Sequence, residues 1–457
     1  MPTWSQKLID YLIQAPEYAD NLVYVKNTDC FLLYDEIKKY YKIIKNEDMI
    51  KLVYLFFKNK ADKNITKQII KDMVWHISVC CYRRIEDLPK DYIAFEDKLL
   101  NLSNLNFEDF DRNKYAYHRL PYYSTDIVMQ TPVFDKFMND VCVDENLEPD
   151  QEMKDILQEM FGYYVFEGQK QDSVFFLLGS GANGKSQFVN LLLEIIGYEF
   201  SSAISIQSLT TNRFAAASLI GKKVNICSEE ESKYMKADKF KAMVTGDMIE
   251  CDRKYGDMLF FRPNTKFLFA TNNMPGFDHI GEAIRRRVKI IKFYKKIPKE
   301  LQDKDLFNKM KSEIPGIIGW LKIGGERLKN NNYCFSDSKN LRQTMEEFEE
   351  VISSAVMFYR ETYEEAEDKF IATDDIYLAY KEWCENNGRK VMSKYNMSKD
   401  IGEVYKLKTI VKWSAEHGRN MRGRQLKYKS YENEQPTIFG VGGGDEIGQD
   451  NVADLVV

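Results

Sequence analysis

Apolar residues recur along the chain in two patterns. Near the N-terminus, Ile50–Lys58 and Lys67–Val79 carry them at helical spacing, whereas Tyr92–Leu102 resembles a pair of strands. Two more helical patterns lie between residues 125 and 165. From Ser173 onward, short apolar runs alternate with helical patterns, and these runs read SVFFLL, KVNICS, TKFLFAT and VKIIKF. This alternation predicts an α/β fold around a central, mostly parallel sheet.

The same patterns divide the chain into segments. The last of them contains GVGGG and six acidic residues without Lys or Arg, which is typical of a flexible acidic tail. We expect an N-terminal domain of unassigned role (1–110), a helical collar or oligomerisation segment (111–165), an α/β domain (166–325), a helical connector (326–365), a small C-terminal domain (366–431) and the tail (432–457).

Composition excludes several classes of protein. The 457 residues are 44% hydrophobic and 30% charged, as in ordinary globular chains, so wholesale disorder and fibrous folds are excluded. No apolar run is long enough for a membrane helix, and no export signal is recognisable, so we expect no membrane partner. With 65 basic and 70 acidic residues, the net charge of −5 excludes a uniformly basic nucleic-acid binder but not a local basic patch. Eight scattered cysteines without metal-ligand spacing favour free thiols in a reducing cytoplasm.

A phosphate-binding loop follows the first apolar run of the α/β region. GSGANGKS between a predicted strand and a predicted helix fits G-x-x-x-x-G-K-[ST] in its required context. Backbone N–H groups of such a loop surround phosphate oxygens, the Lys185 amine reaches the β- and γ-phosphates, and the Ser186 hydroxyl can ligate Mg²⁺. The residues expected to bind ATP are Gly179, Ser180, Gly181, Ala182, Asn183, Gly184, Lys185, Ser186 and Gln187.

Acidic residues follow a second strand, where an ATPase needs a carboxylate to hold Mg²⁺ and polarise water. Glu229 and Glu230 come directly after KVNICS, and Glu229, nearest the strand, is the leading candidate. The strand TKFLFAT ends at Asn272, whose amide suits sensing of the γ-phosphate. An arginine run that includes Arg286 and Arg287 precedes VKIIKF and can supply an arginine finger.

Between these strands, MIECD and MLFFR flank a predicted hairpin whose tip is basic and aromatic. The tip residues are Arg253, Lys254 and Tyr255.

The order of phosphate loop, acidic strand end, hairpin, ATNNMP and RRRVKIIKF within about 120 residues resembles superfamily 3 helicases, an AAA+ branch. The likeness is greater to the phage and plasmid primase–helicase family, and replication initiator-helicases of bacterial mobile elements, such as staphylococcal pathogenicity islands, are the expected kind of protein. The upstream segments IAFEDKLLNL and LQEMFGYYVF, the second of which is predicted to be a helix, extend the likeness to residues 90–300.

The resemblance implies a role for each matching residue. Lys185 and Ser186 match Walker A, Glu229 and Glu230 match Walker B, and Asn272 matches the sensor asparagine. Arg287, or failing it Arg286, matches the finger that acts on a neighbouring subunit's ATP. Lys254 and Tyr255 match the tip of the pore hairpin. The implied machine is a homo-hexameric ring in the cytoplasm of a bacterial host that moves 3′→5′ on single-stranded DNA, with a primase or host replication proteins as further partners.

The C-terminal segment concentrates positive charge. From Arg389 to Lys429 there are twelve Lys or Arg and three acids, and two predicted helices are followed by short strands. This is the order of a winged helix-turn-helix, in which a helix and a wing contact double-stranded DNA such as a replication origin. The residues predicted to touch DNA there are Lys394, Lys399, Arg422 and Arg424. A solvated basic face of a lid domain is the alternative.

Two rival functions stay open on the sequence alone. One is a P-loop ATPase that remodels proteins or packages double-stranded DNA. The other is an origin-binding protein that uses ATP only as an assembly switch.

Overall fold

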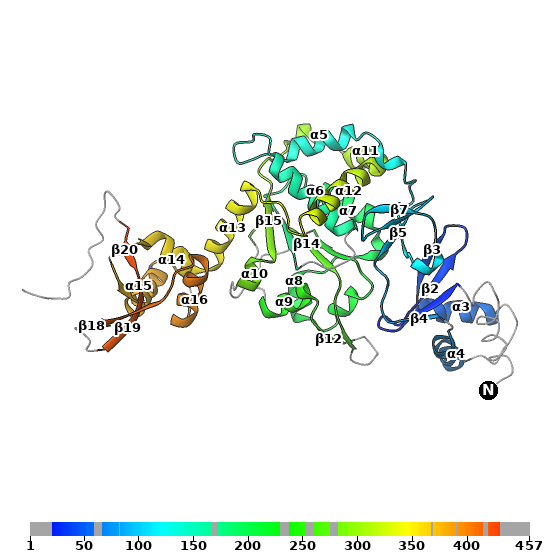
Figure 1. Ribbon diagram of the computed structural model, residues 1–457, viewed down its shortest axis with the longest axis horizontal. Helices are drawn as coiled ribbons and strands as arrows, with labels where there is room; N and C mark the ends of the chain where they lie inside the picture. The colour runs from blue at the N-terminus through cyan, green and yellow to red at the C-terminus, as the bar shows by residue number, and fades with distance from the viewer. Residues whose placement is uncertain are drawn as a thin grey trace, which may run out of the picture. The chain divides into compact units, whose positions relative to one another are not determined.

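The protein is described from a computed structural model (Figure 1). The described residues are 21–58, 66–81, 83–166, 172–228, 237–252, 259–274, 282–366, 369–389, 391–414 and 419–429. The chain forms two compact units, residues 1–353 and 354–457. The boundary falls inside the helical connector predicted for 326–365.

From residue 21 to 119, the described part of the first unit contains two small sheets. One has the order β3-β2-β1-β4 and packs against two helices, and the other has the order β7-β6-β5-β8. Their elements are β1 (Leu22–Val25), β2 (Cys30–Asp35), β3 (Tyr40–Lys45), α3 (Asn46–Lys58), α4 (Lys67–Cys80), β4 (Arg83–Ile85), β5 (Tyr92–Ala94), β6 (Leu99–Asn101), β7 (Asn106–Glu108) and β8 (His118–Arg119). The predicted helices and the strand pair of β5 and β6 are confirmed, whereas the meander of β1–β3 was not predicted.

The centre of the first unit is a five-stranded parallel sheet with the order β10-β11-β14-β9-β15. The predicted α/β fold with a parallel sheet is therefore confirmed. Its strands are β9 (Val174–Leu178), β10 (Ser201–Ser202), β11 (Val224–Cys227), β14 (Lys266–Thr271) and β15 (Val288–Lys292). Every residue of β9, β11 and β14 is buried, as expected for strands covered on both faces. The helices and the antiparallel pair around this sheet are α7 (Lys185–Ile196), α8 (Ile206–Thr211), α9 (Ala237–Thr245), β12 (Ile249–Cys251), β13 (Leu259–Phe261) and α10 (Glu282–Arg285).

A helical layer joins segments that are far apart in sequence. It consists of α5 (Pro132–Val141), α6 (Gln151–Phe166), α11 (Leu306–Ser312), α12 (Ile314–Asn330) and α13 (Lys339–Ile352). Helices α6 and α12 approach so closely that a Cβ added at Gly162 would lie 2.4 Å from the Gly325 nitrogen. Glycines at this crossing therefore allow backbone-to-backbone packing.

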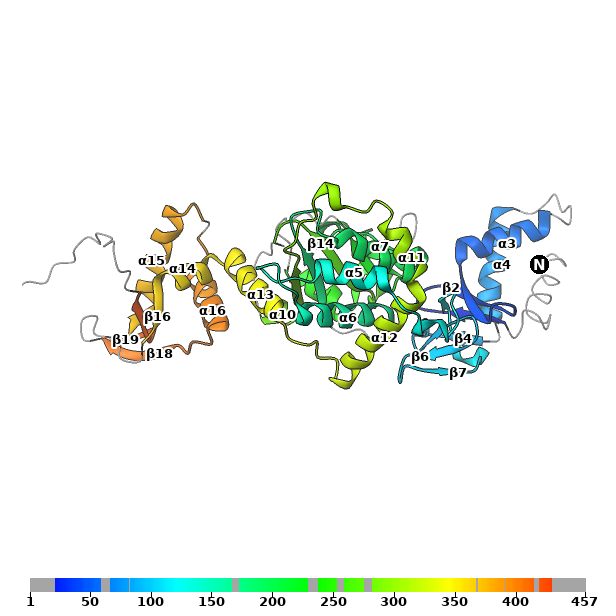
Figure 2. The same cartoon turned by 90° about the horizontal axis from the view of Figure 1, so that it is seen from above.

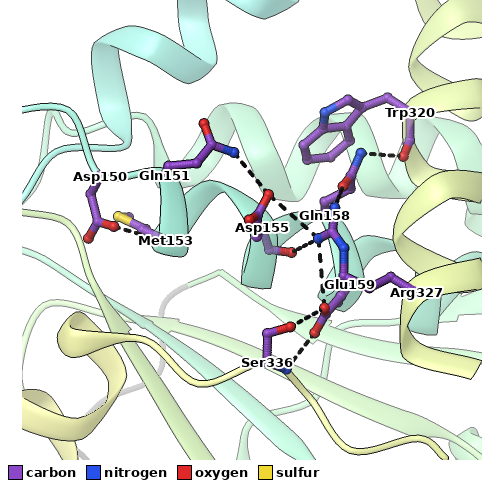
Figure 3. Close-up of polar contacts among 9 residues, drawn as sticks. All are labelled: Asp150, Gln151, Met153, Asp155, Gln158, Glu159, Trp320, Arg327 and Ser336. Atoms are coloured by element: carbon purple, nitrogen blue, oxygen red, sulfur yellow. Dashed lines mark hydrogen bonds and ion pairs between the residues drawn. The ribbon is translucent and has the colours of Figure 1, made fainter. Parts of the chain in front are cut away.

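A buried polar network supports the same crossing (Figure 3). The Glu159 carboxylate is fully buried and accepts hydrogen bonds from the Ser336 N–H at 2.7 Å and from its hydroxyl at 2.5 Å. Arg327 donates to the Gln158 side-chain oxygen at 2.8 Å, and Gln158 donates to the Trp320 carbonyl at 2.9 Å. These bonds satisfy polar groups inside an otherwise apolar layer and fix the relative placement of the two helices.

The described residues of the second unit form three helices and several short strands. Its elements are α14 (Ser354–Thr362), β16 (Tyr363–Glu365), β17 (Ile371–Ala372), α15 (Thr373–Asn386), α16 (Lys394–Val404), β18 (Ile410–Ser414), β19 (Arg419–Arg424) and β20 (Leu426–Tyr428). Strands β18 and β19 lie side by side (Figure 2) and pair antiparallel. Strand β17 pairs antiparallel with β19 on its other side. The predicted order of two helices followed by strands is present, and its assignment as a winged helix stays a prediction.

Candidate nucleotide site

The phosphate loop lies at the carboxyl edge of the parallel sheet. It follows β9 directly, and β14 is the neighbouring strand, with Leu178 paired to Thr271. The Gly179 N–H donates to the Thr271 carbonyl at 3.1 Å. This bond continues the ladder by one residue, so that the first loop glycine and the end of β14 lie side by side.

Backbone conformation shapes the loop. Gly181, Ala182 and Gly184 have φ values of +93°, +51° and +88°, which is the region that favours glycine. A Cβ at Gly184 would lie 2.9 Å from Val141 and 3.0 Å from Phe137, both on α5. Helix α5, which belongs to the predicted helical segment 111–165, therefore packs against the loop. The motif alone did not indicate this contact.

The Lys185 side chain turns back into the loop. Its amine donates to the Gly179 carbonyl at 2.5 Å, to the Asn183 amide oxygen at 3.1 Å and to the Asn272 amide oxygen at 3.4 Å. Lys185 is 6% exposed, and burial lowers the pKa of its amine to about 8. The three acceptors that the described residues supply are neutral oxygens, and an anionic phosphate would add a counter-charge and raise this pKa.

The residues present fit a nucleotide phosphate. Within the described part of the chain, the buried Asn183 Nδ2 and Gln187 Oε1 atoms lack a hydrogen-bond partner. No atom of the described residues lies within 4 Å of a Cβ built on Gly181, so the loop is open to these residues on that side. Ser186 is exposed at the start of α7, where a hydroxyl can reach a metal ion bound to the phosphates.

The structure brings the predicted sensor to the loop, but the predicted acids cannot be placed. Asn272 follows β14 and contacts Lys185, so a residue 87 positions away joins the site. Glu229 and Glu230 lie outside the described residues, although β11, which precedes them, ends at the same sheet edge. Their roles in holding Mg²⁺ and polarising water stay predictions.

The two candidate finger arginines have different surroundings. Arg287 is 2% exposed and forms an ion pair with Asp172 at 2.9 Å, whereas Arg286 is exposed. Both precede β15, at the opposite end of the strand from Lys292, which pairs with Leu178 beside the loop. The start of β15 is therefore about 13 Å from Lys292, measured along the strand. An arginine there faces away from its own phosphate loop, and of the two only Arg286 is exposed to a neighbouring molecule.

The predicted pore hairpin is described only at its base. Strands β12 and β13 pair antiparallel, with Cys251 opposite Leu259, as the sequence predicts. The tip residues Arg253, Lys254 and Tyr255 lie outside the described residues, so their contact with DNA stays a prediction.

The basic residues of the second unit divide into two groups. Lys399 and Arg422 are exposed, and Lys394 is about half exposed, with an ion pair to Asp374 at 2.5 Å. Arg424 is only 4% exposed, and it donates to the Leu407 carbonyl at 3.1 Å and to the Ser398 hydroxyl at 3.2 Å. The structure therefore corrects the prediction for Arg424, which anchors α16 to β19 and does not face DNA.

The sequence did not predict a group of lysines at the amino-terminal ends of β11 and β14. Lys223, just before β11, donates from its amine to His118 Nδ1 at 2.8 Å. His118 is 1% exposed. Burial lowers the pKa of His118 well below its usual value, and it lowers the pKa of Lys223 to about 7. No local motif marks this pair, because the two residues are 105 positions apart.

Two family models match parts of the chain. A family of unknown function, DUF5906, matches residues 177–287, which include the phosphate loop and the arginine run. The poxvirus D5 protein-like family matches residues 354–438, which correspond to the second unit. Each match covers less than half of the chain.

The chain is also similar to two viral proteins. It is 27% identical over 177 residues to "Putative helicase L207/L206" of Acanthamoeba polyphaga mimivirus, which covers 37% of this chain and 18% of that protein. It is 24% identical over 283 residues to "Putative helicase 121R" of Invertebrate iridescent virus 3, which covers 53% of this chain and 30% of that protein. The alignments therefore span less than a third of either relative.

Among solved structures, the NrS-1 C-terminal region in its A-form apo state is similar over 89% of this chain and 96% of that chain. Its TM-score is 0.49 and its identity is 14%. Within the described residues, no helix is both long and apolar enough to span a bilayer.

Proposed function

We propose that this chain is an ATP-dependent DNA helicase that acts in replication. The observation that carries the proposal is the placement of the Lys185 amine among Gly179, Asn183 and Asn272 at the carboxyl edge of a parallel sheet. Such a cradle suits transfer of a phosphoryl group to water, because positioning and charge stabilisation supply most of the catalysis. The names of the two viral relatives support strand separation as the work done.

The proposed division of labour follows from the site. Backbone N–H groups of residues 179–184 and the Lys185 amine hold the phosphates, and Ser186 with Glu229 or Glu230 holds Mg²⁺. The metal ion neutralises charge on the transferred phosphoryl group. Glu229 accepts the proton of the attacking water, and Asn272 orients that water or contacts the γ-phosphate.

A ring of six copies completes the site in this proposal. The arginines before β15 lie at the sheet edge opposite the phosphate loop, so an arginine finger must come from a neighbour. We assign the finger to Arg286, since Arg287 is buried against Asp172. The β12–β13 hairpin then carries Lys254 and Tyr255 into a central channel, where they contact the phosphates of one strand. Movement in the 3′→5′ direction, loading at an origin and a primase or host replication partner belong to the same proposal.

The second unit is proposed to bind double-stranded DNA as a winged helix. Helix α16 would lie in the major groove with Lys394 and Lys399, and the β18–β19 hairpin would place Arg422 against the backbone. Its match to the poxvirus D5-like family supports a replication role. A bacterial host and a cytoplasmic location stay predictions.

A forked duplex with a fluorophore and quencher tests the function. With ATP and Mg²⁺, we expect the wild type to separate the strands and Lys185→Ala to hydrolyse ATP about 100- to 1000-fold more slowly and to separate none. Lys67→Ala, on the exposed face of α4, is the matched control and should behave as the wild type. ATP hydrolysis without strand separation by the wild type would favour a remodelling or packaging ATPase. ATP binding without hydrolysis would favour the assembly switch.

A further inference from the structure

A cavity lies at the amino-terminal ends of β11 and β14, at the opposite end of the sheet from the phosphate loop. Its volume is about 490 Å³, which is within the range of ligand pockets. The walls come from the β1–β2 turn, the segment before β5, the start of β11 and the base of the β12–β13 hairpin. All of these belong to the first compact unit.

The cavity concentrates positive charge. Of its described lining residues, five are cationic and one, Asp87, is acidic. The cations are Lys90, Lys222, Lys223, Arg262 and Lys266. Burial lowers the pKa of Lys90 and Lys222 as well as that of Lys223. Collecting amines in a partly desolvated space is unfavourable for their charged forms, and a bound anion would relieve that cost.

Neutral groups hold three of these amines in place, and one of them is the Lys266 amine, which donates to the Tyr163 carbonyl at 2.5 Å. Lys222 donates to the Glu199 carbonyl at 2.7 Å, and Lys223 donates to His118 Nδ1 at 2.8 Å. Asp87 accepts a hydrogen bond from the Asn27 amide at 3.0 Å. The amines are therefore positioned by dipoles, which leaves their charge available to an anion.

Apolar and aromatic groups accompany the cations. Phe260 and Met248, at the base of the hairpin, are 57% and 60% exposed and line the cavity, as does Tyr117. Of these, Phe260 is the exposed ring on which a base could stack, whereas Tyr117 is 6% exposed. Cations beside an exposed aromatic ring are a combination by which proteins hold single-stranded nucleic acid, because bases stack while amines contact phosphates. The hairpin base links this cavity to the predicted DNA-contacting tip.

We propose that this cavity binds a phosphate-bearing nucleotide, supplied by the single strand that the hairpin contacts. The proposal rests on the proposed helicase function, and it adds a second place where the strand is held, outside the hairpin tip. A free mononucleotide has the same chemistry, so the experiment compares the two sources. The strand is favoured because Phe260 and Met248, two exposed residues at the base of the hairpin, line the cavity.

The test measures binding of a fluorescent oligothymidylate by fluorescence anisotropy at salt concentrations from about 50 to about 200 mM. Over this range, affinity that depends on phosphate contacts decreases strongly. Lys90→Gln combined with Lys222→Gln should weaken binding about 10-fold and lower the salt slope by about 1.4, since each phosphate contact on a single strand contributes about 0.7. The control combines Lys67→Gln with Lys71→Gln, two exposed lysines of α4 that do not line the cavity. It removes the same charge and should bind within about twofold of the wild type.

Lysine acetylation of the wild type, read by mass spectrometry, provides a second measurement that does not depend on the variant folding. We expect the oligothymidylate to protect Lys90 and Lys222, and thymidine monophosphate at the same nucleotide concentration to leave them reactive. Protection by the mononucleotide alone would overturn the assignment to a strand. If the wild type binds the oligonucleotide while Lys90 and Lys222 stay reactive and both double variants bind alike, the cavity proposal fails and the helicase proposal stands. If the wild type binds no single strand, the proposed function itself fails.

Discussion

Two arginine clusters, one in each compact unit, look alike in sequence and differ in structure. Before β15, the adjacent residues Arg286 and Arg287 have different environments. Arg287 is buried against Asp172, whereas Arg286 is exposed. On β19, Arg422 and Arg424 are two positions apart and should share a face, yet only Arg424 is buried. In the first cluster the backbone turn decides which arginine faces solvent, and in the second a neighbouring helix does.

Helix α16 explains the second case. A Cβ added at Gly402 would lie 2.8 Å from Arg424 Nη2, so the absence of a side chain there admits the guanidinium. Arg424 then bonds Leu407 and Ser398. A count of basic residues therefore overestimates a DNA-binding surface, because some of the charge is used to hold the unit together.

The first prediction sharpens the contrast between Arg286 and Arg287. Arg286→Ala should lower ATP turnover of the assembled protein by about 1000-fold without changing its thermal midpoint, because a finger acts only in the transition state. Arg287→Ala should lower the free energy of unfolding by about 1–3 kcal/mol, since it removes a buried ion-paired group. Calorimetry and an ATPase assay measure both.

Mixing tests whether the site is shared between subunits. Equal amounts of Arg286→Ala and Lys185→Ala chains should recover part of the turnover that each lacks alone, because some interfaces then carry both intact residues. No recovery on mixing, in samples shown to co-assemble, would contradict a finger supplied by a neighbour.

The second prediction concerns Arg422 and Arg424. Arg424→Met should lower the free energy of unfolding of the second unit by about 2–4 kcal/mol, because the partly buried oxygens of Ser398 and Leu407 lose their donor. Arg422→Met should leave stability within about 0.5 kcal/mol and weaken binding to duplex DNA, with a salt slope lower by about 0.9. Equal stability losses in the two variants would show that the distinction between anchor and contact residue is mistaken.

The third prediction uses a buried basic group that stays neutral. The folded-state pKa of His118 lies below its unfolded value, so its contribution to stability is present above about pH 6.5 and decreases as the pH falls. Between pH 6.5 and 5, the free energy of unfolding should decrease by up to about 1.4 kcal/mol per pH unit from this residue. Urea denaturation of His118→Gln should show a correspondingly smaller pH dependence. An unchanged slope would mean that His118 binds a proton as readily in the folded state as in the unfolded state.

The sequence predicted well what local patterns encode. The motif from Gly179 to Ser186 predicted the strand before it, the helix after it and a lysine that reaches into the loop. It could do so because such a motif specifies backbone geometry and chemistry together. The strands around β14 followed from their continuous apolar runs. Long-range packing was beyond prediction, as the support of Gly184 by α5, the burial of Arg424 and the Lys223–His118 contact show. In each case a residue's environment is set by a segment that no local pattern links to it.

The most direct test of the account measures ATP turnover and strand separation in one sample on a forked duplex, with the wild type and with Lys254→Ala. We expect the wild type to couple the two, so that single-stranded DNA stimulates turnover and the duplex opens. Lys254→Ala should continue to hydrolyse ATP while opening no duplex, because the hairpin no longer contacts the strand. Strand separation by Lys254→Ala at the wild-type rate would contradict the claim that ATP hydrolysis acts on DNA through this hairpin.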